Sequence, residues 1–385
     1  MKAIYLLRRP LPSALVASAL LGGCLDAYPR LNEIQVLGTH NSYHIQPRPS
    51  VLAALASFEP ETAATLEYSH LPLSEQLDRG ARQLELDVFA DPEGGRYARR
   101  AGLLAVGENP ESGLAELEEP GLKVLHIQDL DFETHCLSFV RCLELVRGWS
   151  RENPTHLPIL IMVEAKQEAI DDPLSLGFVL PLQFGSAELD TIDAEIRSVF
   201  SEAELITPDE VRGSAATLER AVLTHGWPSV AAARGRVLFT LLNGDAARER
   251  YVDGHASLSG RAMFTTSEVG KPEAAFFNVN DALADGERIA SLVSAGYLVR
   301  TRADIDTLQA RSGDTSLQQA AFASGAQFVS TDYLVPDARF GTGYVAELPG
   351  EGVARCNPLA PARHCDPSRD ALSGRSPKSA QGMRH

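Results

Sequence analysis

Short apolar runs bounded by Gly, Pro, Asn and Asp alternate along the chain with stretches whose apolar residues recur at helical spacing. The runs indicate strands, and stretches such as Leu137-Val140-Leu143-Val146 and Ala194-Ile196-Val199-Phe200 indicate helices. Residues 262–265 compete for the sixth strand within a Gly- and Ser-rich stretch, 254–275, that is typical of a long loop. The pattern predicts eight strands, at about residues 34–39, 82–88, 122–127, 159–165, 236–242, 275–279, 297–302 and 326–331. Such an alternation predicts an α/β fold, a single (β/α)8 TIM barrel with loop insertions.

Polar and charged residues stand at the ends of the first four predicted strands. Because the carboxyl ends of barrel strands meet at one mouth, these side chains are expected to converge there. Residues two apart on a strand share a face, which places Glu85 with Asp87 and Glu164 with Lys166. Charged groups that face a barrel interior are costly to bury unless they pair or bind a cation. The residues concerned are His40 and Asn41, Glu85 and Asp87, His126, and Glu164 and Lys166.

Part of this group forms an all-oxygen set of possible metal ligands. One amide and three carboxylates suit Ca²⁺, with Mg²⁺ as the second choice. The reference pKa of histidine lies near neutrality, so His40 and His126 suit proton transfer. The predicted metal ligands are Asn41, Glu85, Asp87 and Glu164.

Each motif also has a structural interpretation when it is taken alone. His40 could cap a turn, and His126 could be a satisfied core histidine. The Glu85-x-Asp87 pair could bind arginines of the outer helices, and the Glu164-x-Lys166 pair could bond to itself across the pleat. Their occurrence at the ends of four successive predicted strands favours a shared functional site over these separate interpretations.

Two arginines also stand two residues apart at the end of the seventh predicted strand. Arg300 and Arg302 share a face, so they could hold a phosphate or sugar hydroxyls, unless a carboxylate such as Asp304 pairs with them. The remaining histidines have no such support and are expected to be structural or exposed; they include His44, His70, His135 and His225.

The N-terminus has the layout of an export signal. Basic residues precede an apolar run, Leu11 to Leu21, and Leu21-Gly22-Gly23-Cys24 resembles a bacterial lipobox. We expect residues 1–23 to be a lipoprotein signal and Cys24 to anchor an exported protein at the outer membrane or cell surface. Ordinary cleavage nearby, giving a secreted protein, is the alternative.

The other four cysteines and the net charge limit which metals and partners the protein can bind. The spacings of Cys136 with Cys142 and Cys356 with Cys365 allow two local disulfides and lack the Cys-x-x-Cys pattern of a zinc site. A formal charge of −16 argues against nucleic acid as a partner and against broad attachment to an anionic bilayer.

We expect a monomer with a catalytic domain at 24–335, an extension at 336–365 and a disordered tail at 366–385. An insertion at 90–120 is expected to be a solvated loop or a substrate lid.

The ordered motifs resemble the catalytic X region of Ca²⁺-dependent phosphoinositide-specific phospholipases C in their compact bacterial form. The similarity runs from about residue 31 to 335. It rests on Thr39-His40-Asn41-Ser42-Tyr43, Leu84-Glu85-Leu86-Asp87-Val88, Leu125-His126 and Ile161-Met162-Val163-Glu164. The resemblance implies a phosphatidylinositol-type lipid substrate at a membrane surface, cleaved on the glycerol side by attack of the inositol 2-hydroxyl. It also implies that His126 protonates the glycerol oxygen, that His40 stabilises the transition state, and that Glu85 or Glu164 takes the hydroxyl proton.

Lys166 departs from that pattern and is similar to a Glu-x-Lys of glycerophosphodiester phosphodiesterases, which are also barrel enzymes. Those enzymes have Arg after the first histidine, where this chain has Asn41. A soluble phosphodiester hydrolase therefore remains the alternative enzyme. A non-catalytic lipid- or glycan-binding surface lipoprotein is the third possibility, and the intact histidine and carboxylate set counts against it.

Overall fold

The computed structural model describes residues 29–244, 246–350, 352–360 and 365. The predicted signal at 1–23, Cys24 and the predicted tail at 366–385 lie outside the described residues. Within the described ranges, every helix is too short or too polar to cross a membrane.

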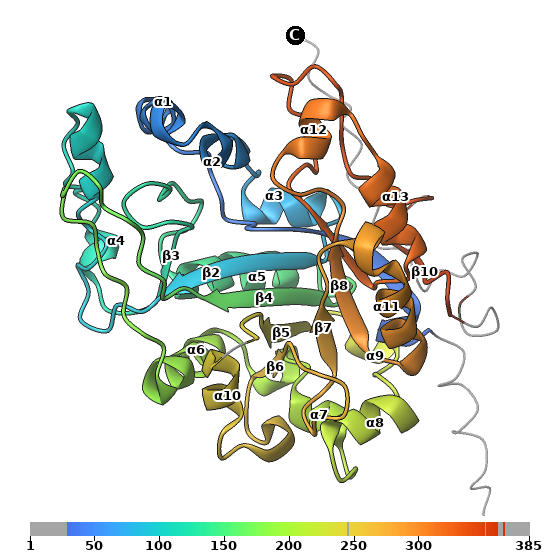
Figure 1. Ribbon diagram of the computed structural model, residues 1–385. Helices are drawn as coiled ribbons and strands as arrows, with labels where there is room; N and C mark the ends of the chain where they lie inside the picture. Colours follow the sequence, from blue (N-terminus) through green and yellow to red (C-terminus); the bar gives the residue numbers. More distant parts are fainter. Residues whose placement is uncertain (1–28, 245, 351, 361–364, 366–385) are drawn as a thin grey trace, which may run out of the picture.

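A nearly closed barrel of parallel strands forms the centre of the molecule (Figure 1). The hydrogen-bonded order is β6-β5-β4-β2-β1-β9-β8-β7, and a bridge between Thr266 and Phe276 brings its two ends together. The parallel strands in the described part of the chain are β1 (Ile34–Thr39), β2 (Gln83–Phe89), β4 (Ile159–Ala165), β5 (Val237–Leu241), β6 (Met263–Thr265), β7 (Phe276–Asn278), β8 (Leu298–Arg302) and β9 (Phe328–Thr331). The predicted fold class is thus confirmed.

One predicted barrel strand is wrong. Residues 122–127 contribute only β3 (Lys123–Val124), which pairs antiparallel with the end of β2, Val88 opposite Val124. The helical turns between β2 and β3 are too short to carry the chain back to the other end of the barrel, as a parallel crossover requires. The competing segment at 262–265 supplies the missing barrel strand, β6.

Helices surround the barrel, and the two predicted from spacing are present. α5 (Phe139–Glu152) buries Phe139, Leu143 and Val146 against the core, and Ser138 caps its first turn. The second is α6 (Ser186–Val199). The other helices are α1 (Pro49–Phe58), α2 (Pro60–Thr65), α3 (Leu73–Asp78), α4 (Ala115–Glu118), α7 (Pro208–Arg212), α8 (Leu218–Thr224), α9 (Val230–Ala233), α10 (Ala246–Val252), α11 (Ala282–Ala295), α12 (Leu308–Ser312) and α13 (Ser316–Ala323).

The insertion at 90–120 is packed against its neighbours over part of its length. It contains the 3₁₀ helix η3 (Ala101–Val106) and α4, and Leu103 of η3 clusters with Val51 of α1 and with Phe132. Asp129 accepts hydrogen bonds from the backbone N–H of Ala101 and of Val179, each at 2.7 Å. The insertion is therefore joined to α1 and to the loop that follows β4.

The C-terminal extension adds a strand to the start of the barrel. β10 (Ala354–Cys356) pairs antiparallel with the first half of β1, Ile34 opposite Cys356 and Val36 opposite Ala354. Both predicted disulfides are present, between Cys136 and Cys142 and between Cys356 and Cys365.

Candidate active site

Three carboxylates meet inside the barrel at the carboxyl ends of β2 and β4. Glu85 and Asp87 share one face of β2, and the parallel register places Asp87 beside Glu164. One oxygen of each residue lies within 4.8 Å of the others. Glu85 and Asp87 are buried, whereas Glu164 is partly exposed.

The hydrogen bonding of this cluster fits a cation. Neither oxygen of Asp87 accepts a hydrogen bond of normal geometry from the described residues. Burial, and next the charge of Glu164, raises the pKa of Asp87 well above its usual range. Buried carboxylates with free oxygen lone pairs are a donor set that Ca²⁺ prefers.

Asn41, the fourth predicted ligand, lies two residues after the end of β1 in a left-handed backbone conformation, with φ 44°. The next residue, Ser42, binds Glu85 twice: its N–H donates to the Glu85 carbonyl at 2.9 Å, and its Oγ accepts from the Glu85 N–H at 2.8 Å. The amide nitrogen of Asn41 donates to the Tyr68 hydroxyl at 3.2 Å, a bond that does not use its amide oxygen.

Two cationic side chains contact the carboxylate cluster. Arg300 of β8 donates from Nη2 to Glu85 Oε2 at 2.9 Å and from Nη1 to Asn278 and Asn280. Lys166 Nζ lies 3.5 Å from Asp87 Oδ2 and 3.6 Å from Glu164 Oε1. Two of the three predicted cations, Lys166 and Arg300, are thus part of the cluster, and Arg300 is bound to one of its carboxylates.

His40 follows β1 and belongs to a second buried network with Arg302 and Asp332. Its Nδ1 lies 2.9 Å from Asp332 Oδ1, and Arg302 donates to Asp332 Oδ2 at 2.7 Å. Arg302 Nη1 is also 3.4 Å from His40 Nε2, which must therefore accept, so that Nδ1–H donates to Asp332. Burial, and next the Arg302 guanidinium, lowers the pKa of His40 to about 3. His40 Nε2 is 3.9 Å from Glu85 Oε1, which connects this network to the carboxylates.

Sequence reasoning missed Asp332, although a signal was available. Asp332 directly follows β9, the last barrel strand, so it occupies the same kind of position as the residues that were singled out. His70 is also part of this region: its Nε2 lies 2.7 Å from the His40 carbonyl oxygen.

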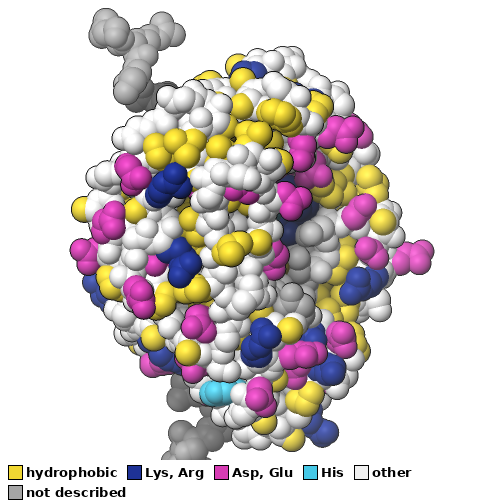
Figure 2. All heavy atoms as spheres, turned by 60° about the vertical axis from the view of Figure 1, so that its left-hand side comes forward, with side chains coloured by type: hydrophobic (Ala, Val, Ile, Leu, Met, Phe, Trp, Pro, Cys, Tyr) yellow, Lys and Arg dark blue, Asp and Glu magenta, His cyan; other side chains and the backbone are white. Residues whose placement is uncertain are grey.

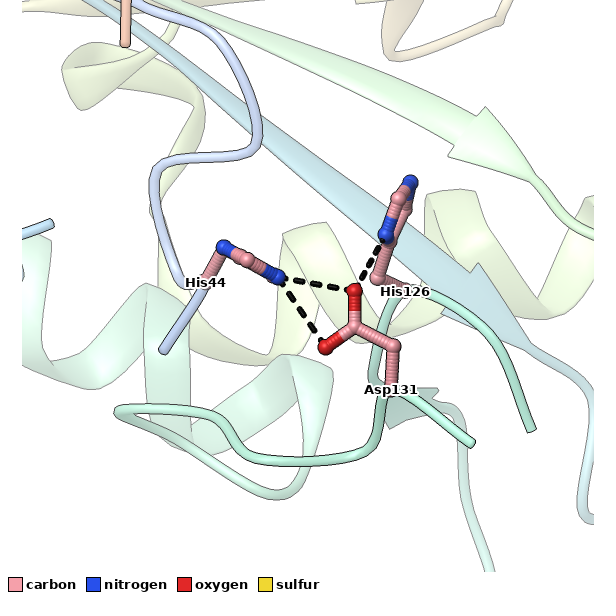
Figure 3. Close-up of side chains that lie close together, drawn as sticks. All are labelled: His44, His126 and Asp131. Atoms are coloured by element: carbon pink, nitrogen blue, oxygen red, sulfur yellow. Dashed lines mark hydrogen bonds and ion pairs between the residues drawn. The ribbon is translucent and has the colours of Figure 1, made fainter. Parts of the chain in front are cut away.

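His126 lies two residues beyond β3, at the start of a tight loop that a bridge between Ile127 and Asp131 closes. Its Nδ1 is 2.7 Å from Asp131 Oδ2, and His44 Nε2 is 2.8 Å from the same oxygen. Figure 3 shows the Asp131 carboxylate between the two imidazole rings. Burial lowers the pKa of His126, and the hydrogen bond and charge of Asp131 act in the opposite direction. His44 is fully buried, as a structural histidine would be, but its partner Asp131 also binds His126 of the candidate site.

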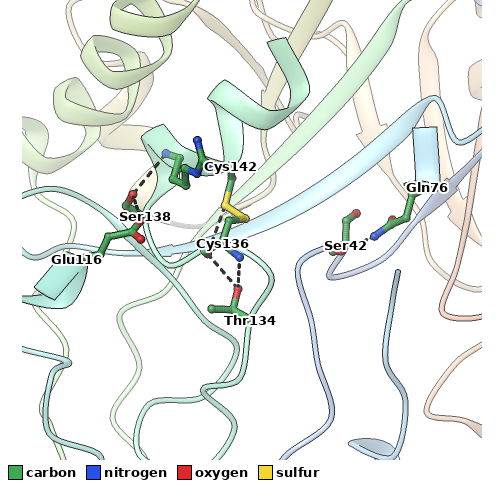
Figure 4. Close-up of a disulfide and its surroundings, with 8 residues drawn as sticks. Ser42, Gln76, Glu116, Thr134, Cys136, Ser138 and Cys142 are labelled. Carbon is green, nitrogen blue, oxygen red and sulfur yellow. Dashed lines mark hydrogen bonds between the residues drawn. A yellow bond between two sulfur atoms is a disulfide. The ribbon is translucent and has the colours of Figure 1, made fainter. Parts of the chain in front are cut away.

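A disulfide lies next to the loop that carries His126 and Asp131. Cys136 follows that loop, and Cys142 lies within the first turns of α5 (Figure 4). His135, just before the disulfide, donates from its backbone N–H to the Tyr43 carbonyl at 2.9 Å. Gln76 of α3 donates from Nε2 to the Ser42 carbonyl at 2.6 Å and so holds the segment after β1. These contacts fix the loops that position both histidines.

The surface shows no continuous patch of one charge on the side turned forward in Figure 2, where acidic, basic and hydrophobic side chains are interspersed.

Comparisons with known proteins identify the family. Residues 29–358 match the model of the family described as phosphoinositide phospholipase C, Ca²⁺-dependent. A search of curated proteins finds no match.

Solved structures show the same fold at low sequence identity. The calcium-dependent phosphoinositol-specific phospholipase C of a Pseudomonas species has a TM-score of 0.54 and 15% identity, over 86% of this chain and 97% of that chain. The Ca²⁺-dependent phosphatidylinositol-specific phospholipase C of Streptomyces antibioticus has a TM-score of 0.50 and 21% identity, over 79% and 95%. By the family match over most of its length, the chain belongs to the Ca²⁺-dependent phosphoinositide phospholipases C, which are phosphoric diester hydrolases.

Proposed function

We propose that this protein is a phosphatidylinositol-specific phospholipase C that cleaves the glycerol-side P–O bond. The observation that carries the proposal is the meeting of three carboxylates within 4.8 Å beside two histidines, each hydrogen-bonded to its own aspartate. The family match supports the substrate class, and the bond cleaved and the nucleophile are our inference.

Glu85, Asp87 and Glu164, with the amide oxygen of Asn41, would hold Ca²⁺. When bound, the ion lowers the pKa of the substrate hydroxyl and offsets negative charge on the phosphoryl oxygens. The electrostatic reason for a cation at this place is that the cluster has three carboxylates, two of them buried, and only two cationic side chains among the described residues contact it.

His126 is proposed as the general acid. Asp131 binds its Nδ1, which leaves Nε2 for the substrate, and it favours the protonated imidazole that an acid needs. Arg302 and His40 are proposed to stabilise the charge that develops on the phosphoryl group, with Asp332 orienting both. His40 takes this role in its protonated form, which the negative charge of the bound phosphodiester favours: Nδ1–H then donates to Asp332 and Nε2–H to the phosphoryl oxygen.

In the proposed reaction, the inositol 2-hydroxyl oxygen bonds to phosphorus and its proton passes to Glu85 or Glu164. The bond from phosphorus to the glycerol oxygen breaks, and that oxygen receives the proton of His126. The products are diacylglycerol and an inositol cyclic phosphate, which water can open in a second step.

Phosphorus NMR of the products tests this function. With Ca²⁺, the purified protein is expected to convert phosphatidylinositol into inositol cyclic phosphate, and with a chelator it is expected to leave the lipid intact. Glycerophosphoinositol serves as the comparison substrate. Faster turnover of that soluble diester than of the lipid, or release of glycerol phosphate, would favour a glycerophosphodiester phosphodiesterase and would contradict the proposal.

Replacing Asp131 by asparagine tests the proposed acid. The substitution removes the charge that raises the pKa of His126, so Asp131→Asn should lower kcat by roughly 10- to 100-fold. An acid loses its proton as the pH rises through its pKa, so the high-pH limb of the kcat profile should move to lower pH. Asp129→Asn changes another carboxylate of this loop, one that binds backbone N–H groups instead of an imidazole, and should leave that limb in place. An unmoved limb in Asp131→Asn would refute the assignment.

A further inference from the structure

Lys166 lies between two of the three carboxylates that are proposed to hold Ca²⁺. Its Nζ is 3.5 Å from Asp87 Oδ2 and 3.6 Å from Glu164 Oε1. Both separations exceed the usual hydrogen-bond distance, so charge rather than a directed bond holds the ammonium there. Glu164 and Lys166 share one face of the chain at the end of β4, which is why the lysine reaches the cluster.

The two cationic side chains of the cluster differ in how firmly their charged groups are held. Arg300 is 1% exposed and donates to Glu85, Asn278 and Asn280, which fixes its guanidinium. The Lys166 side chain is 22% exposed and ends a flexible stem. Of the two, Lys166 is the cation that can move.

A divalent ion and the Lys166 ammonium compete for the same oxygens. Two cations a few ångströms apart repel strongly in a partly buried site, so an ion bound by Asp87 and Glu164 would drive the ammonium away. Glu168 is exposed beyond the end of β4 and also attracts Lys166, which gives the displaced ammonium a carboxylate outside the cluster.

We propose that Lys166 is the resident counter-cation of the calcium site, which pairs with Asp87 and Glu164 until Ca²⁺ displaces it. This inference rests on the proposed function, because it takes these carboxylates as calcium ligands. Two consequences follow: Lys166 weakens Ca²⁺ binding, and it stabilises the calcium-free protein.

Calorimetric titration of chelator-treated protein with CaCl₂, without lipid, tests the first consequence. Lys166→Met should bind Ca²⁺ about tenfold more tightly than the natural protein, because the competing charge is gone. Lys166→Arg keeps that charge and should not gain affinity. Lys271→Met removes the same charge from an exposed loop outside the site and should bind as the natural protein does.

Thermal denaturation tests whether Lys166 stabilises the calcium-free protein, and it also shows whether the variant is folded. Without Ca²⁺, Lys166→Met should melt at a lower temperature than Lys271→Met, and Ca²⁺ should raise its melting temperature by more. Should Lys166→Met be unfolded in chelator, Lys166→Gln, which removes the charge and keeps a polar group at this place, takes its part in the titration.

Unchanged or weaker Ca²⁺ binding by the neutral variant, or a Ca²⁺-free melting temperature of Lys166→Met that is no lower than that of Lys271→Met, would overturn the inference while leaving the calorimetric binding of the natural protein intact. A natural protein that binds no Ca²⁺ would instead overturn the calcium site itself. The two failures are therefore distinguishable.

Discussion

Replacing His126 by alanine is expected to lower kcat toward phosphatidylinositol by a factor on the order of 10²–10⁴. The glycerol alkoxide is a poor leaving group, and His126 is the histidine whose Nδ1 is held by Asp131 so that Nε2 can deliver a proton. A phosphodiester of inositol with a nitrophenol leaving group should lose far less, because nitrophenolate departs without a proton. Steady-state kinetics on the two substrates measures the difference.

His40→Ala provides the matching comparison. Charge develops on phosphorus whichever group leaves, so this variant should lose activity toward both substrates alike. Equal losses in His126→Ala would remove its role as the acid. Rates close to those of the natural protein in both variants would mean that the active site lies elsewhere.

Removal of Ca²⁺ should abolish turnover, and Asp87→Asn should weaken Ca²⁺ binding by about 10- to 100-fold or more. Asp87 is the cluster member whose two buried oxygens have no hydrogen bond of normal geometry among the described residues, so the ion would be their main partner. An asparagine at this position removes one negative charge and one of the two carboxylate oxygens. Calorimetry gives the affinity, and activity across a Ca²⁺ series gives the requirement.

Asp253→Asn is the control for this change, since Asp253 is exposed after α10 and lies outside the cluster. Its Ca²⁺ affinity should equal that of the natural protein. Full activity in excess chelator, or an Asp87→Asn variant that binds Ca²⁺ unchanged, would rule out the proposed ligand set.

The barrel could be predicted from the sequence because its strands are local apolar runs. Segments such as Ile159–Ala165 carry enough apolar residues to be recognised alone. The wrong strand at 122–127 was equally apolar at Leu122, Val124 and Leu125. Leu122 and Val124 are buried in the main core and Leu125 packs on Phe89 and Tyr97, yet the segment pairs only briefly, and antiparallel, with the end of β2. Apolar character reports burial, and it does not distinguish a barrel strand from a loop that is held against the barrel.

The site residues could be predicted where charged residues stand two apart at the end of a single strand. Glu85 and Asp87 are two residues apart, as are Glu164 and Lys166, and the period of a strand places each pair on one face. Asp131 has no such position, because it reaches His126 through a turn and shares its carboxylate with His44 from another loop. Such partners depend on tertiary contacts that spacing does not encode.

The pairing of β10 with β1 sets the boundary of the unit that has to be produced. The recognisable motifs end near residue 335, which would suggest stopping an expressed fragment there. Such a fragment would lose the partner of Ile34–Val36 and expose backbone N–H and C=O groups along an edge that β10 covers. Exposed edges of this kind recruit other chains, so the shortened protein should aggregate, and a soluble fragment has to continue through Cys365.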